Sequence, residues 1–142
     1  MRILAVDPGE KRLGIALSDP SATIASPFTI LNHVSRSIDA AAISSLAAEH
    51  GVARIIVGQA LDAENQPTPQ GRRSARLAAA IQAQTNLPVE LWDESDSTQA
   101  ARSAHIALGG SARQRQRRGH GHLDDLAATY ILQTWLDAHS KP

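Results

Sequence analysis

The sequence contains no cysteine, which excludes a disulfide framework and a thiolate metal site. Only four of its 142 residues are aromatic, which argues against reading single strands by stacking bases on aromatic side chains. No apolar run approaches the roughly 18 residues that a membrane span needs, and Met1 leads directly into a strand-like segment, without a targeting pattern. We therefore expect one cytoplasmic domain over residues 1–142, with no membrane partner.

The sequence also lacks net charge, because 14 basic residues balance 14 acidic ones. The balance is uneven along the chain, since no acidic residue occurs between residues 97 and 123. That segment holds five arginines and three histidines, and arginine outnumbers lysine twelve to two overall. The planar guanidinium of arginine suits bidentate phosphate contacts. The distribution therefore indicates phosphate contacts that the net charge alone does not predict.

The first segment of the chain predicts a hairpin that ends its first strand on a carboxylate. Residues 3–6 are apolar and are followed by Asp7, and residues 11–18 form the returning strand. Between them, the Pro-Gly pair predicts a type II turn with a positive φ at Gly9. From these residues alone, Asp7 is either a turn carboxylate that bonds its own backbone or a group that holds a cation or a phosphate.

The remaining chain alternates between strand and helix patterns. We expect strands over residues 27–31, 53–57 and 87–92, and helices over residues 35–50, 70–85, 97–108 and 124–138. Residues 111–122 contain almost no apolar side chain and predict a mobile loop. A meander followed by alternating helices and strands predicts an α/β fold: a five-stranded mixed sheet with helices on both faces.

Three acidic residues occupy comparable places in this arrangement. Asp7 ends the first strand, Glu94 follows the fifth, and Asp124 begins the last helix. Converging carboxylates without thiolates favour Mg²⁺ or Mn²⁺ over Zn²⁺, and two such ions can clamp the attacking and leaving oxygens of a phosphodiester. Each acid also has a structural alternative: Glu94 as a solvated loop residue and Asp124 as a helix N-cap. Spacing alone does not separate Glu94 from Asp93.

Several motifs occur in a characteristic order along nearly the whole chain. They are ILAVDPGEKR at residues 3–12, SDP at 18–20, IIVG at 55–58, DE at 93–94, ST at 97–98, and Asp124 with the following AA and IL pairs. In these motifs the chain resembles the YqgF/RuvX-like family of pre-16S rRNA nucleases and Holliday junction resolvases. The resemblance implies a ribonuclease H-like fold. It also implies a metal-dependent nuclease that processes the 5′ end of precursor 16S rRNA in ribosome biogenesis.

Carried over by position, the family's catalytic and metal-binding acids are Asp7, Glu94 and Asp124. Phosphate contacts are expected from a set of basic side chains: Lys11, Arg12, Arg113, Arg115, Arg117, Arg118 and His122. The chain departs from the family pattern at Ser95, where arginine is usual, and at His122, where lysine is common. These departures concern substrate contact rather than the metal-binding acids.

The sequence leaves two other functions open and argues against a third. A DNA Holliday junction resolvase needs a two-fold dimer with two sites facing one junction, so the chain is expected to be either a monomer or a homodimer. A non-catalytic RNA-binding assembly factor would keep the fold without the chemistry. An actin-like ATPase also uses an Asp-x-Gly turn between two strands, but it needs a duplicated domain that this length does not provide.

Overall fold

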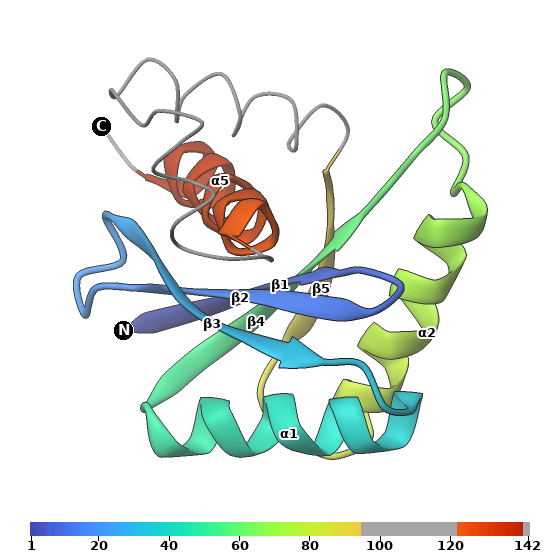
Figure 1. The fold of residues 1–142 in the computed structure, drawn as a ribbon. Helices are drawn as coiled ribbons and strands as arrows, with labels where there is room; N and C mark the ends of the chain where they lie inside the picture. Colours follow the sequence, from blue (N-terminus) through green and yellow to red (C-terminus); the bar gives the residue numbers. More distant parts are fainter. Residues whose placement is uncertain (95–121, 141–142) are drawn as a thin grey trace.

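The fold is built on a five-stranded mixed sheet with strand order β3-β2-β1-β4-β5. The computed structural model describes residues 1–94 and 122–140, with residues 122–125 described by their backbone alone (Figure 1). The strands are β1 (Arg2–Pro8), β2 (Arg12–Ser18), β3 (Ala25–Asn32), β4 (Val52–Gln59) and β5 (Val89–Asp93). The first three strands form an antiparallel meander, whereas β1, β4 and β5 run parallel. The carboxyl ends of β1, β4 and β5 therefore share one edge of the sheet.

Helices cover both faces of the sheet, which confirms the predicted layers (Figure 1). Helices α1 (Arg36–Glu49) and α2 (Pro69–Gln82) pack on one face, and α5 (His122–His139) packs on the other. Alternation along β1 divides its side chains between two cores. Leu4 and Val6 are buried beneath α1 and α2, whereas Ile3 and Ala5 are buried beneath α5. No helix within the described residues is long and apolar enough to cross a membrane.

The strands and helices predicted within residues 1–94 are all present, with ends that differ by a few residues. Strand β3 lies at a sheet edge, as its proline predicts, and Gly51 follows α1 with φ +63°. The predicted helix over residues 97–108 and most of the predicted loop over residues 111–122 lie outside the described residues. Helix α5 begins at His122, two residues before the predicted start.

The type II turn predicted at Gly9 is wrong. Gly9 is absent from the positive-φ residues, a group in which Gly51 is the single glycine within the described part of the chain. Instead, the Gly9 N–H donates to the carbonyl oxygen of Arg12 at 2.9 Å. A Cβ at this position would lie 2.5 Å from that oxygen. The turn therefore requires glycine because two backbone segments approach closely, and a left-handed conformation plays no part.

The start of α2 is fixed against the end of β4. Thr68 caps the helix, since its hydroxyl accepts a hydrogen bond from the Gly71 N–H at 3.0 Å. The Gln59 side-chain amide donates to the Gly71 carbonyl oxygen at 3.2 Å. A Cβ at Gly71 would clash with the carbonyl oxygen of Ala60. Glycine at this position therefore lets the helix pack directly on the strand backbone.

Gly71→Ala should destabilise the protein by about 1–3 kcal/mol, because the added methyl group forces backbone atoms apart. The sign is informative, since replacing glycine by alanine inside a helix ordinarily stabilises it by roughly 0.5–1 kcal/mol. Urea denaturation measures the difference, and Arg72→Ala, at the next and exposed position, should stay within about 0.5 kcal/mol of the parent. An unchanged midpoint for Gly71→Ala would contradict the close packing.

Candidate active site

Asp7 lies near the carboxyl end of β1, at the edge where the parallel strands end. In the sheet register Val6 pairs with Val57, and the next residue of β4, Gly58, pairs with Trp92 of β5. Every second residue of a strand points to the same face, so the side chain of Asp7 lies with those of Ile3 and Ala5 on the face that α5 covers. The side chain is half-buried there. The first predicted acid therefore stands where three parallel strands converge.

Glu94 follows β5 directly and is positioned by the end of β4. Its backbone N–H donates to the carbonyl oxygen of Gln59 at 2.9 Å. A Cβ built on Gly58 would lie 3.3 Å from both Cδ and Oε1 of Glu94, and 2.7 Å from Cδ1 of Ile131 in α5. Gly58 thus leaves the space over β4 that the Glu94 side chain occupies. A larger residue at this position would obstruct the path from β5 toward Asp7.

Burial and a neighbouring acid strongly perturb Glu94. The pKa of Glu94 is raised to about 9, mainly by loss of solvent and further by the charge and side-chain hydrogen bond of Asp7 and the charge of Asp93. The contact with Asp7 shows that the structure brings these two predicted acids together. Asp93 itself is exposed, so the geometry favours Glu94 where spacing alone did not choose. Without a cation, Glu94 carries a proton at neutral pH.

One atom of this pair has the character of a metal ligand. Among the described residues, Oε1 of Glu94 is buried and has no hydrogen-bond partner. A buried carboxyl oxygen without a partner is costly, and a cation bound beside Asp7 would remove that cost. The donor atoms are carboxylate oxygens, which match hard divalent ions such as Mg²⁺ and Mn²⁺. The residues present therefore fit a divalent metal ion.

The third predicted acid, Asp124, falls in the first turn of α5, where the structure describes no side chain. Ile131 of the same helix packs over Gly58, two turns further along. Within the described part of the chain, no three His, Cys, Asp or Glu side chains gather to hold a metal ion. The structure thus unites two of the predicted acids, and the role of Asp124 stays a prediction.

The predicted phosphate-contacting residues divide into two groups. Lys11 is exposed and Arg12 is half-buried at the turn that follows Asp7, so both are close to that acid in the sequence. The side chain of His122, at the start of α5, lies outside the described residues. The same holds for the four loop arginines, Arg113, Arg115, Arg117 and Arg118.

The SDP motif at residues 18–20 serves the fold. The Ser18 hydroxyl accepts a hydrogen bond from the Ile3 N–H at 2.9 Å and ties β2 to the start of β1. The Asp19 carboxylate accepts from the backbone N–H groups of Thr23 and Ile24, at 2.8 and 2.9 Å. Hydrogen bonds from Ile24, Ser21 and Thr23 lower the pKa of Asp19 to about 2. Asp19 therefore organises the β2–β3 turn.

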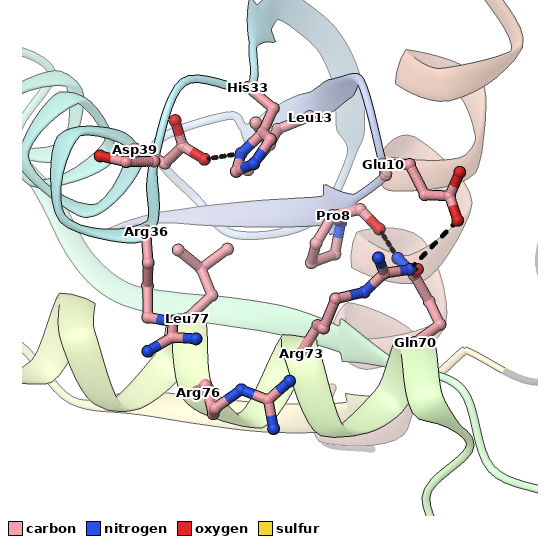
Figure 2. A pocket seen from close by; sticks show the side chains of 12 residues that line it. Pro8, Glu10, Leu13, His33, Arg36, Asp39, Gln70, Arg73, Arg76 and Leu77 are labelled. Carbon is pink, nitrogen blue, oxygen red and sulfur yellow. Dashed lines mark hydrogen bonds and ion pairs between the residues drawn. The ribbon is translucent and has the colours of Figure 1, made fainter.

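Sequence reasoning missed Gln70, which supports the Asp7 end of β1 from the other face of the sheet. Its side-chain amide donates to the carbonyl oxygen of Pro8, the residue after Asp7 (Figure 2). Gln70 also accepts a hydrogen bond from Arg73, which pairs with Glu10 at 3.5 Å. The only sequence signal for this contact was the predicted start of a helix at Gln70. Nothing in the sequence indicated that this helix would reach the turn after Asp7.

Known structures share this fold. Thermus thermophilus RuvC, solved with a Holliday junction substrate, superposes with a TM-score of 0.62 and 13% identity, covering 97% of this chain and 94% of that one. The fowlpox virus resolvase, solved with Holliday junction DNA, gives a TM-score of 0.59 at 12% identity, covering 99% of this chain and 100% of that one. These likenesses confirm the predicted ribonuclease H-like fold class.

Sequence comparisons extend over almost the entire chain. A Myxococcus xanthus protein named "Putative pre-16S rRNA nuclease" is 34% identical, covering 100% of this chain and 91% of its own length. A Moorella thermoacetica protein of the same name is 36% identical, covering 96% of this chain and 95% of its own length. The family model described as "RuvX: Holliday junction resolvase" matches residues 1–138. The chain therefore belongs to the RuvX family.

Proposed function

We propose that this protein is a metal-dependent phosphodiester hydrolase that processes the 5′ end of precursor 16S rRNA in the cytoplasm. The observation that carries the chemistry is the partnerless Oε1 of Glu94, buried beside Asp7 at the edge where β1, β4 and β5 end. The names of the relatives that match nearly the full chain support precursor rRNA as the substrate.

In this proposal Asp7 and Glu94 hold Mg²⁺ or Mn²⁺, with Asp124 as a third ligand. A bound divalent ion supplies Lewis-acid chemistry, since it activates water and neutralises charge on the scissile phosphate. Asp7 is fixed by its place in the sheet, where it pairs with Gly14 of β2. Glu94 gives up its proton when the ion binds. The protein's part is to hold two carboxyl groups so close together that Glu94 keeps a proton until a cation takes its place.

Substrate contact is assigned to basic side chains near the turn. Lys11 and Arg12 lie at the far side of the turn that follows Asp7, where they suit phosphates flanking the scissile bond. We assign the same role to His122 and to the arginine segment, residues 113–118, on sequence grounds. Contacts of this kind position a strand without reading its sequence.

The second candidate is a DNA Holliday junction resolvase, which the description of the matching family model favours. The difference is geometric, because symmetric cutting of a four-way junction needs two sites related by a two-fold axis. A monomer would cut one strand at a time. The oligomeric state in solution, measured on the same preparation as the activity, therefore bears directly on the choice.

The two candidates separate in one parallel experiment. Purified protein with Mn²⁺ is incubated with labelled precursor rRNA, duplex DNA and a four-way DNA junction, and Asp7→Asn serves as the control for contaminating nuclease. Cutting of RNA alone supports the proposed function, and paired symmetric nicks in the junction support the resolvase. Binding of RNA without cutting, at every metal ion tried, would refute the hydrolase and favour an assembly factor.

Replacing Arg113, Arg115, Arg117 and Arg118 by alanine should weaken RNA binding about equally for different sequences. It should also reduce the slope of log K against log salt by roughly 0.7 for each single-strand phosphate that the variant no longer neutralises. Fluorescence anisotropy over a salt series measures both effects. Thermal unfolding, measured on the same variant, shows whether the substitutions act on binding alone. An unchanged salt slope would show that the arginine segment is a linker that binds no phosphate.

A further inference from the structure

A pocket of about 250 Å³ lies between the β1–β2 turn, the start of α1 and the first half of α2 (Figure 2). Leu13 and Leu77, which line it, belong to the core beneath α1 and α2. The pocket is therefore on the opposite face of the sheet from the Asp7 side chain, which belongs to the α5 face. The two sites are separated by the backbone of the turn, and the proposed hydrolase chemistry does not use the pocket.

A buried acid organises one wall of this pocket. Asp39 is 4% exposed, and its Oδ2 lies 2.5 Å from Nδ1 of His33. Its Oδ1 accepts the Val34 N–H at 3.0 Å. Both carboxylate oxygens are thus satisfied inside the protein, and the His33 ring is held in one orientation with Nε2 as its remaining polar atom. A buried carboxylate thus fixes the orientation of a half-exposed ring at the edge of the pocket.

The pocket has more positive than negative charge. Three arginines and two acids line it, and each acid has a partner: Asp39 with His33, and Glu10 with Arg73. Arg36 and Arg76 have no hydrogen-bond or ion-pair partner among the residues that the structure describes. Figure 2 shows Arg36 extending from α1 toward α2, the helix that carries Arg76. Two guanidinium groups from different helices can therefore bind an anion in this pocket.

We propose that this pocket binds a phosphate group carried on a sugar. Arginine forks bind phosphate oxygens in pairs, so Arg36 and Arg76 suit a doubly charged phosphomonoester better than a carboxylate. Leu13, Leu77 and Pro8, which are almost fully buried, close the inner end of the pocket, against which the carbon skeleton of the sugar would lie. The volume is below the roughly 300–1,000 Å³ of pockets for drug-sized ligands, which limits the occupant to about one nucleotide unit.

Two sources share this chemistry: a free mononucleotide and the 5′-terminal phosphate of a nucleic acid strand. Either occupant would lie against the turn that follows Asp7, because Pro8 lines the pocket and accepts the Gln70 hydrogen bond. The inference does not rest on the proposed hydrolase function, since it concerns different residues on another face. Binding can therefore be tested in excess chelator, where the metal-dependent chemistry is silent.

Isothermal titration calorimetry with adenosine 5′-monophosphate, with adenosine as the matched ligand, tests the proposal. The double variant Arg36→Ala/Arg76→Ala should bind the monophosphate about tenfold or more weakly than the parent, since each charge-assisted hydrogen bond contributes substantially. Arg72→Ala removes an arginine from the same helix outside the pocket lining and should bind as the parent does. Both arginines of the double variant are exposed, so its unfolding midpoint should match the parent.

The source is identified with an RNA trinucleotide that carries either a 5′-phosphate or a 5′-hydroxyl. Binding of the phosphorylated trinucleotide alone, abolished in the double variant, assigns the pocket to strand ends. Binding of the free monophosphate with the same sensitivity assigns it to mononucleotides. The proposal is overturned if no ligand shows phosphate-dependent binding, or if the double variant binds as tightly as Arg72→Ala.

Discussion

Asp7→Asn should lower the rate of phosphodiester cleavage by more than about a hundredfold while the protein stays folded. Even partners of metal ligands cost 10–100-fold when they are replaced, and Asp7 is proposed as a ligand itself. The amide keeps the shape of the side chain but removes its charge. Because Glu94 is protonated at neutral pH, the amide oxygen that Asp7→Asn introduces can still accept its hydrogen bond, so the melting temperature should change little. Single-turnover cleavage and thermal unfolding measure the two effects.

The matched control for this experiment is Asp93→Asn. Asp93 also lies at the carboxyl edge of the sheet, but its side chain is exposed and acts on Glu94 only through its charge. Its replacement should change the cleavage rate by no more than a few-fold. If Asp7→Asn cleaves as fast as the parent, the two-carboxylate site is wrong. Equal losses in both variants would mean that general charge at this edge matters, rather than ligation by Asp7.

The sheet was predictable because its signals are local. The apolar runs of β1 and β4 have no competing helical period, and Gly51 marks the end of α1 with its positive φ. Turn chemistry was less predictable. A Pro-Gly pair predicts a type II turn, yet the Gly9 N–H bonds to Arg12 across a close backbone approach. The hairpin register, which local turn propensity does not contain, decided the conformation.

The candidate site was predictable in outline only. The place of each acid relative to its strand indicated Asp7 and Glu94, but spacing could not exclude Asp93. What separates Glu94 from Asp93 is the space above Gly58, which depends on the packing of α5 through Ile131. That packing joins segments more than seventy residues apart in the sequence. The pocket that Arg36 and Arg76 line depends on a similar long-range arrangement, the packing of α1 against α2, which the periodicity of the sequence does not encode.

Metal affinity should rise about tenfold for each unit of increasing pH, up to the pKa of Glu94. Burial and Asp7 raise the pKa of Glu94 to about 9, so in the metal-free protein it must release a proton before it can bind a cation. Titration calorimetry with Mn²⁺ in buffers of different ionisation enthalpy should therefore show release of close to one proton at pH 7. Glu94→Gln has no proton to release, and its remaining weak affinity should depend little on pH.

The same group sets how the stability of the metal-free protein depends on pH. Glu94 has a higher pKa in the folded protein, about 9, than its ordinary value of 4.5, so the folded state binds the extra proton between these values. Stability should accordingly fall as pH rises from about 4.5 to about 9, with a slope of at most about 1.4 kcal/mol per pH unit. Urea denaturation at several pH values in chelator measures the slope, which Glu94→Gln should flatten. Equal slopes in both proteins would show that Glu94 is ionised without a metal ion. The raised pKa would then no longer support a metal site beside Asp7.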